Sequence, residues 1–311
     1  MNILEECIVV CAALVCIPAF AQTSATPPKA LANAKISSTS SYPDYDIVRS
    51  VPFAHPQGIQ LVADMYLPHG SGPFPAIVFI HGGGWRNGDR MQLRRQAAYM
   101  AAHGMVGMAI EYRLAPAHPF PAGVKDSRAA VEWLRKHATQ YHVDPRRIAA
   151  VGSSSGGNLA ADLGVESLMS QAGKGANVEA VVSFNGIYDL AAMRPTSMIS
   201  DFLGKPCTKA QKVCRKASPT DHVRPGEPPF LILHGTDDKT APYSQAAAFV
   251  KKLQNAGVSA QLYTAMGAPH TFWAEKRWYK PSQQAMFIFL THSFSSDPAV
   301  KTASPSRTSL P

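Results

Sequence analysis

Short runs of apolar residues, each about as long as one buried strand, alternate along the chain with segments whose apolar residues recur at helical spacing. The expected strands are Ile47–Phe53, Ile59–Leu67, Ala76–His81, Val106–Tyr112, Ile148–Ser153, Val178–Phe184, Phe230–His234 and Ala260–Ala265. The expected helices are Gln92–His103, Gly123–His137, the segment after Ser153, Ala241–Ala256 and Gln283–Phe294. Because parallel strands need crossover connections, the alternation predicts an α/β fold with a mostly parallel eight-stranded sheet and helices on both faces. The first two strands, which turn at His55–Gly58, are expected to pair antiparallel.

Changes in polarity along the chain predict its domain organisation. An apolar stretch that ends in Ala19-Phe20-Ala21 predicts a signal peptide over residues 1–21, and hence a secreted or periplasmic protein. Glu5 and Glu6 stand where such leaders are usually basic, so a mis-assigned start codon and a buried N-terminal element remain alternatives. Residues 22–44 are expected to be a polar linker, 45–295 one α/β domain, and 296–311 a disordered tail. The irregular stretch 187–224 is expected to be a small lid insert within the domain.

Composition and charge exclude several classes of protein. With 311 residues, 46% of them hydrophobic and 16% charged, the chain suits a globular protein rather than a collagen, a coiled coil or a disordered chain. No apolar run reaches the roughly 18 residues needed to span a bilayer, so no integral membrane segment is expected after leader cleavage. The net charge of +9 comes from scattered Lys and Arg residues, and we therefore expect no nucleic-acid partner.

The number and spacing of the cysteines indicate the redox compartment of the protein. Three of the five lie within the expected leader, which leaves Cys207 and Cys214. An even pair with six residues between its members, in a loop, predicts a local disulfide in an oxidising compartment. Two free thiols are the alternative, and would be expected of a cytosolic protein.

A candidate nucleophile, Ser154, lies in Gly152-Ser-Ser-Ser-Gly156, between an expected strand and an expected helix. Small residues two positions either side of a serine permit a sharp strand-to-helix turn that lifts the hydroxyl clear of the backbone. A serine-rich helix N-cap is the alternative. Phosphate binding is disfavoured, because no Gly-Lys-Ser/Thr follows.

The base and the acid that would activate this serine are expected after it in the sequence, because hydrolases of this topology place a carboxylate and then a histidine after the nucleophile. His270 follows a strand end and is the candidate base. Asp237 and Asp238 both follow the preceding strand, and spacing alone does not choose between them. Asp189 lies one strand too early and is expected to be a structural cap for the lid.

A glycine-rich loop, His81-Gly82-Gly83-Gly84-Trp85, directly follows the strand ending at Ile80. Successive glycines let backbone N–H groups approach a developing oxyanion, so Gly83 and Gly84 are expected to form an oxyanion hole with Ser155. A flexible glycine turn without this role is the alternative.

These motifs and the segments around them resemble α/β-hydrolase-fold serine esterases of the H-G-G-G type, over about residues 45–295. The segments that carry the resemblance are Phe74–Trp85, Glu111–Pro116, Phe120–Ala122, Val143–Ile148 and Gly152–Leu159. His234–Asp238 followed by Pro242, and Lys216–Pro219, are most similar to the bifunctional acetylxylan/feruloyl esterase-like branch.

The resemblance implies a role for each matched position. Ser154 matches the nucleophile, His270 the base, and Asp238 the acid, which in the family lies four residues beyond the strand-end histidine. The sequence departs from the family at Thr271–Trp273, where glycine is common, and in its strand pair where related lipases carry N-terminal cap helices. A large lipid-binding cap is therefore not expected.

The expected activity is that of an enzyme, a serine carboxylic ester hydrolase without metal or organic cofactor. Short-chain acyl esters are the general substrate expectation, and acetylated or feruloylated plant polysaccharide the specific one. Trp85, Phe272 and Trp273 are candidate pocket residues, with ordinary packing as the alternative. Two other functions are considered: a serine exopeptidase, which by resemblance would carry a large N-terminal propeller, and a non-catalytic binding protein, which would typically lack a triad residue.

Overall fold

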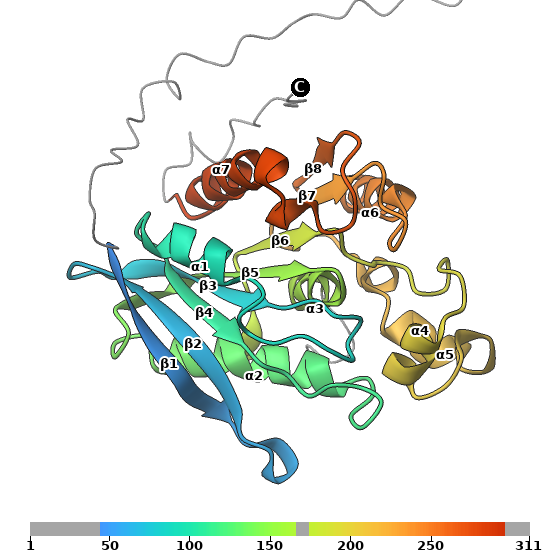
Figure 1. The fold of residues 1–311 in the computed structure, drawn as a ribbon, viewed down its shortest axis with the longest axis horizontal. Coiled ribbons are helices and arrows are strands. Elements are labelled where there is room, and N and C mark those ends of the chain that lie inside the picture. Colours follow the sequence, from blue (N-terminus) through green and yellow to red (C-terminus); the bar gives the residue numbers. More distant parts are fainter. Residues whose placement is uncertain (1–43, 166–173, 296–311) are drawn as a thin grey trace, which may run out of the picture. The chain divides into compact units, whose positions relative to one another are not determined.

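A single eight-stranded sheet organises the part of the chain that the computed structural model describes, residues 44–165 and 174–295 (Figure 1). The strands are β1 Tyr45–Ala54, β2 Leu61–Pro68, β3 Phe74–Ile80, β4 Val106–Ile110, β5 Val143–Ser153, β6 Ala180–Phe184, β7 Phe230–Gly235 and β8 Ala260–Ala265. Their order across the sheet is β1-β2-β4-β3-β5-β6-β7-β8. β1 pairs antiparallel with β2, and β2 antiparallel with β4, whereas every pair from β4 to β8 is parallel. The expected mostly parallel sheet is confirmed.

Helices connect the parallel strands as crossover connections require. The α-helices are α1 Arg94–Ala101, α2 Ala122–Lys136, α3 Ser155–Gly164, α4 Ser197–Leu203, α5 Gln211–Lys216, α6 Tyr243–Asn255 and α7 Lys276–Ser293. Short 3-10 helices are η1 Pro56–Gly58, η3 Lys174–Ala176, η4 Cys207–Lys209, η5 Pro219–His222 and η6 Phe272–Ala274. Because β3, β5, β6, β7 and β8 run the same way, the loops that follow them lie along one edge of the sheet.

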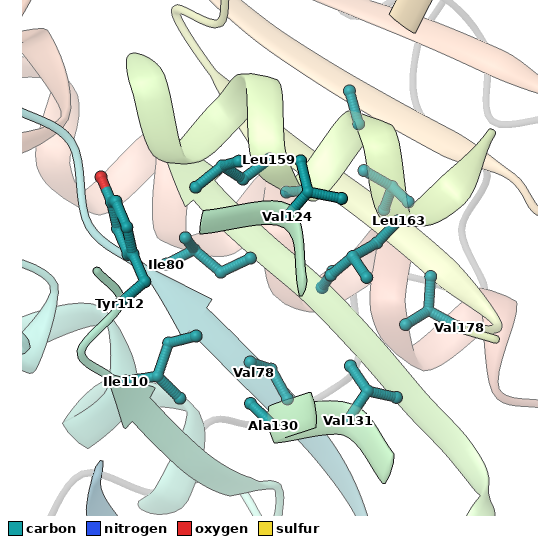
Figure 2. Packing of buried hydrophobic residues seen from close by; sticks show 14 of the residues in the cluster. Val78, Ile80, Ile110, Tyr112, Val124, Ala130, Val131, Leu159, Leu163 and Val178 are labelled. Atoms are coloured by element: carbon teal, nitrogen blue, oxygen red, sulfur yellow. The ribbon is translucent and has the colours of Figure 1, made fainter. Parts of the chain in front are cut away.

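Alternation of side chains along the strands builds one core on each face of the sheet. In β3, Val78 and Ile80 belong to the core under α2, α3 and α6, whereas Ile77 and Phe79 belong to the core under α1 and α7. Figure 2 shows side chains of α2 and α3 lying over β3 in the first core. Each fully buried branched side chain of this kind contributes roughly 1.5–3 kcal/mol to folding. The two cores fix the strand ends from which the site residues project.

Three segments differ from the expectation. The last helix begins at Lys276 rather than Gln283 and contains Pro281. Its first turns are held against α1, because Tyr279 donates a hydrogen bond to the Arg95 carbonyl oxygen (3.0 Å) and packs under the Arg95 guanidinium. β5 begins at Val143, since Val143 pairs with β3 across an irregularity in register. The stretch 187–224, expected to be irregular, contains α4 and α5.

The expected signal peptide over 1–21, nearly all of the linker (22–44) and the tail over 296–311 lie outside the described residues. Within residues 44–165 and 174–295, no helix combines the length and the apolar character needed to cross a bilayer.

Candidate active site

Ser154 occupies a strained turn between β5 and α3. Its backbone torsions are φ 54° and ψ −118°, a region that residues with a Cβ rarely adopt. The chain is tightly packed here: a Cβ on Gly152 would lie 2.0 Å from the Gly156 carbonyl oxygen, and one on Gly156 would lie 2.1 Å from that of Ile80. Only glycine therefore fits at either position, and the turn holds the Ser154 hydroxyl at the N-terminus of α3.

His270 lies in the loop between β8 and η6 and reaches both proposed partners. Its Nε2 is 2.9 Å from Ser154 Oγ, and its Nδ1 is 2.7 Å from Asp238 Oδ2. Asp237 instead faces outward, with its side chain 64% exposed and 3.2 Å from the Lys239 ammonium. The structure thus brings Ser154, His270 and Asp238 into one hydrogen-bonded relay and leaves Asp237 out of it.

The Asp238 carboxylate is fully buried in the loop after β7. Its Oδ1 accepts hydrogen bonds from the backbone N–H groups of Thr240 (2.8 Å) and Ala241 (2.9 Å). Burial alone raises the pKa of this carboxyl, but the imidazoles of His234 and His270 and the Ala241 N–H outweigh burial and hold the pKa well below its usual range. Asp238 is therefore ionised at any pH at which the imidazole can act as a base.

Asn185, which the sequence analysis did not single out, lies over the His270 ring. Its amide nitrogen is 3.2 Å from Nδ1 and 3.1 Å from Nε2, and since Asp238 and Ser154 occupy the ring edge, the amide must approach the face. The residue follows β6, has a φ of 44°, and its N–H donates to the Leu233 carbonyl oxygen (2.8 Å). Asparagine tolerates this left-handed backbone, so the position both bends the chain and supports the imidazole.

The glycine loop after β3 meets the Ser154 turn. A Cβ on Gly82 would lie 3.2 Å from the Ser154 Cβ, so Gly83, Gly84 and Ser155 belong to two loops in contact. Gly83 and Gly84 have φ of 121° and 64°, which favours glycine. Neighbouring backbone N–H groups of this kind can stabilise an oxyanion.

The aromatic residues expected near the site divide into two groups. Trp85 is buried and stacks on Phe202 of α4, with ring centroids 4.1 Å apart. Phe272 and Trp273, in contrast, are buried in the core that α1 and α7 share, where Phe272 neighbours Phe184. The structure thus shows the packing role that was the alternative for Phe272 and Trp273, and places only Trp85 in the glycine loop.

Helix α4 is fastened to that loop. The Arg86 guanidinium is 3.1 Å from the Asp201 carboxylate, and the Met198 side chain covers Gly84 so closely that an added Cβ would lie 2.4 Å from its sulfur. The insert therefore forms a wall beside the loop that contacts Ser154, built on contacts between Trp85 and Phe202, Arg86 and Asp201, and Gly84 and Met198.

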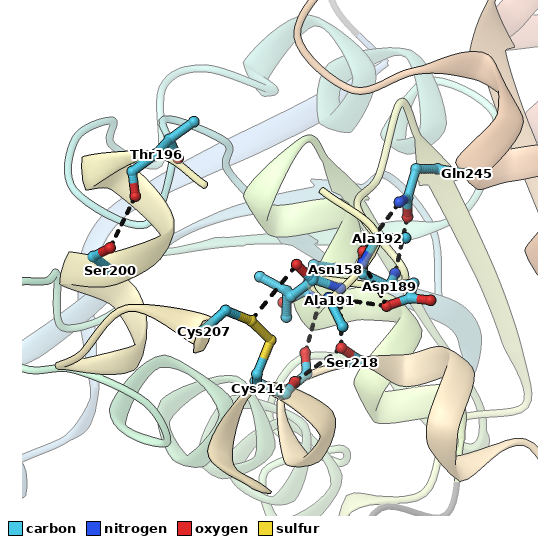
Figure 3. Close-up of a disulfide and its surroundings, with 12 residues drawn as sticks. Asn158, Asp189, Ala191, Ala192, Thr196, Ser200, Cys207, Cys214, Ser218 and Gln245 are labelled. Atoms are coloured by element: carbon cyan, nitrogen blue, oxygen red, sulfur yellow. Dashed lines mark hydrogen bonds between the residues drawn. A yellow bond between two sulfur atoms is a disulfide. The ribbon is translucent and has the colours of Figure 1, made fainter. Parts of the chain in front are cut away.

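Cys207 and Cys214 are joined in a disulfide between η4 and α5, with Cα atoms 5.4 Å apart (Figure 3). Asn158 of α3 ties the insert to the domain, since its amide donates to the carbonyl oxygens of Ile187 (3.0 Å) and Ala217 (3.2 Å). Asp189 accepts from the N–H groups of Ala191 and Ala192, as expected of a local cap. In the part of the chain that the structure describes, no group of three or more His, Cys, Asp or Glu side chains is arranged to hold a metal ion.

A mostly parallel sheet with a serine on a strained turn after β5, and a carboxylate and an imidazole on later loops, defines the α/β-hydrolase class. Solved structures of esterases have the same fold. Esterase 2 of Thermogutta terrifontis with bound butyrate is 28% identical, covers 82% of this chain and 96% of its own, and superposes with a TM-score of 0.69. A truncated carbohydrate esterase from gut microbiota is 25% identical, with a TM-score of 0.72 and coverage of 81% and 97%. The expected fold class is confirmed.

The chain belongs to the BD-FAE family, whose sequence profile matches residues 63–253. Among curated relatives, esterase LipC of Mycobacterium tuberculosis is 33% identical over 64% of this chain and 53% of its own length. The probable carboxylic ester hydrolase LipM of the same organism is 32% identical, over 62% and 48%. The chain thus spans about half the length of the curated relatives it matches.

Proposed function

We propose that this protein is a serine carboxylic ester hydrolase that acts on short-chain acyl esters. The observation that carries the proposal is the continuous relay from Ser154 Oγ through His270 to the buried Asp238 carboxylate, at distances of 2.9 and 2.7 Å. Membership of the BD-FAE family and the esterase relatives support the same reaction class. The complete relay also disfavours a non-catalytic binding protein, which would have no use for it.

The reaction follows from the geometry. Ser154 Oγ attacks the ester carbonyl carbon while His270 Nε2 takes its proton, and Asp238 holds the imidazole in the required tautomer. The carbonyl oxygen becomes an oxyanion that the N–H groups of Gly83, Gly84 and Ser155 stabilise, each typically worth about 3 kcal/mol. His270 then protonates the departing alcohol oxygen, and the same steps with water release the carboxylic acid and restore Ser154.

Two observations favour a small acyl group. The loop that carries the oxyanion N–H groups is covered by Met198 and fastened to α4, which leaves a fixed wall close to the reacting carbonyl. Two of the similar structures of Thermogutta terrifontis esterase 2 have propionate or butyrate bound. The alcohol part of the ester is a separate question. The carbohydrate esterase neighbour, together with the sequence resemblance to acetylxylan/feruloyl esterase-like proteins, supports an acetylated or feruloylated polysaccharide as the natural substrate.

The proposal is tested with p-nitrophenyl esters of increasing chain length, alongside acetylxylan and methyl ferulate, for the wild type and Ser154→Ala. We expect activity to be highest at two to four carbons and to fall by several orders of magnitude in the variant. A fluorophosphonate probe should label the wild type and not the variant. Cleavage of aminoacyl-p-nitroanilides in preference to esters would favour the exopeptidase alternative, and an unlabelled, folded wild type would refute the proposal.

A further inference from the structure

A second histidine contacts the Asp238 carboxylate and takes no part in the mechanism above. His234, at the end of β7, has a fully buried side chain, and its Nε2 lies 3.2 Å from Asp238 Oδ2. That oxygen is the one that accepts the His270 Nδ1–H at 2.7 Å. Two imidazoles therefore compete for one carboxylate oxygen.

The surroundings of His234 define its tautomer. Its Nε2 is also 2.8 Å from the Ala241 carbonyl oxygen, so both neighbours of this nitrogen are hydrogen-bond acceptors and the nitrogen must carry a proton. Its Nδ1 is buried and has no hydrogen-bond partner among the described residues, so a proton there would be an unsatisfied buried donor. The network thus assigns His234 as a neutral ring protonated at Nε2.

The same N–H also holds the loop that presents the carboxylate. His234 donates to the carbonyl oxygen of Ala241, and the N–H of Ala241 donates to Asp238 Oδ1. Fixing Ala241 therefore fixes one of the two backbone donors on Oδ1, while the imidazole itself faces Oδ2. His234 acts on both oxygens of the carboxylate.

We propose that His234 is a positioning residue that orients Asp238 and, by sharing Oδ2, limits how tightly His270 holds the proton it takes from Ser154. The proposal rests on the proposed esterase function. The physical reason is that each hydrogen bond that a carboxylate oxygen accepts draws on its negative charge, so a second hydrogen bond to the same oxygen is weaker. His234 would thereby keep the base neutral, and so active, to lower pH.

The other side chains that contact the His270 ring carry no charge. Ser154 and Asn185, which contact its ring from the turn before α3 and from the loop after β6, are neutral. Asp237 lies in the same loop as Asp238 but is exposed and paired with Lys239. Among the described residues, Asp238 is the one anionic side chain in contact with the His270 ring.

Two variants at the same position separate positioning from packing. His234→Gln keeps an N–H that can reach the Ala241 carbonyl oxygen, whereas His234→Leu keeps bulk and removes the donor. The measurement is kcat/KM for p-nitrophenyl acetate against pH, with thermal unfolding to establish that each variant is folded. We expect the acid limb of the leucine variant to move up by roughly half to one pH unit, a three- to tenfold increase in proton affinity. The plateau should fall about tenfold, and the glutamine variant should keep the wild-type limb.

The outcomes are distinguishable. A leucine variant with a lower plateau but an unmoved acid limb would overturn the proposal, because loss of packing alone does not change how His270 titrates. A measurement on the wild type is independent of folding in the variants: ¹⁵N NMR of the histidine rings should show a neutral, Nε2-protonated ring for His234 through the active pH range, and an Nδ1-protonated ring would refute the inference. A folded wild type that hydrolyses no ester would count against the proposed function, while the ring tautomer would still test the hydrogen bond to Ala241.

Discussion

The close approach of the Ser154 turn to the end of β3 makes Gly156→Ala a test of how the site is built. Gly156 is in the first turn of α3, where alanine suits the backbone, so the effect of the substitution comes from space alone. The new Cβ would lie 2.1 Å from the Ile80 carbonyl oxygen and 2.4 Å from that of His81. Real Cβ contacts do not fall below 3.0 Å, so the two segments must separate by about 0.9 Å.

That separation affects chemistry more than folding. The β3 segment continues into Gly83 and Gly84, and Gly156 follows the nucleophile, so moving them apart displaces the oxyanion donors from the serine. A misplacement of about 1 Å typically lowers the rate about 10²-fold. Overpacking should lower the free energy of unfolding by about 1–3 kcal/mol, which for a domain of this size is a decrease in Tm of roughly 3–10 °C.

The assay is kcat/KM for p-nitrophenyl acetate together with thermal unfolding monitored by circular dichroism. Gly175→Ala is the matched control, because its Cβ would meet Glu132 at an ordinary 3.4 Å and its position is in η3, in the connection between α3 and β6. We expect the control to keep both activity and Tm. A Gly156→Ala protein with wild-type kcat/KM would refute the reasoning that contact between these two loops sets the oxyanion geometry.

Two further predictions concern stability. Because the folded protein holds the pKa of Asp238 below its usual range, its ionised form stabilises the fold above the unfolded-state pKa, and that contribution is lost as pH falls through the folded-state pKa. Urea unfolding should therefore show the stability advantage of the wild type over Asp238→Asn shrinking from about pH 5 downward, and parallel curves would contradict this. Reduction of the Cys207–Cys214 disulfide should lower the free energy of unfolding by about 2–3 kcal/mol, the loop-closure contribution for so short a loop. A Cys207→Ser/Cys214→Ser protein is the control and should be insensitive to reductant, whereas a wild-type Tm unchanged by reductant would argue against the disulfide.

Local sequence patterns were sufficient to predict the strands of the sheet and to locate the candidate residues that lie in motifs. The strands have strong apolar runs, and the Ser154 turn and the Gly82–Gly84 loop carry glycines that are visible in the sequence, although the contacts that require several of them come from other segments. Asn185 and His234 could not be found in this way. Asn185 contacts His270 only because β6, β7 and β8 are adjacent in the sheet. His234 is only four residues from Asp238, but residue type does not specify the course of the loop after β7 that brings the imidazole onto the carboxylate.

Tertiary packing also decided where sequence reasoning went wrong. The apolar pattern places the start of the last helix after Pro281, yet α7 begins at Lys276 and runs through this proline, in a segment where Tyr279 packs on Arg95 of α1. Phe272 and Trp273 follow His270 closely enough to suggest a pocket, but the 3-10 turn η6 directs them into the core under α1 and α7. Whether an aromatic side chain faces a cavity or a core depends on the direction of a single turn, which residue type does not specify.

The attachment of α4 to the glycine loop has a consequence for how substrate arrives. Swinging the insert outward would either break the Arg86–Asp201 ion pair and unstack Trp85 from Phe202, or displace the glycine loop together with α4. We therefore expect substrate to reach Ser154 without an outward movement of α4. We expect an enzyme of this construction to saturate with dissolved, monomeric ester below the solubility limit, with no surge in rate when micelles or droplets form.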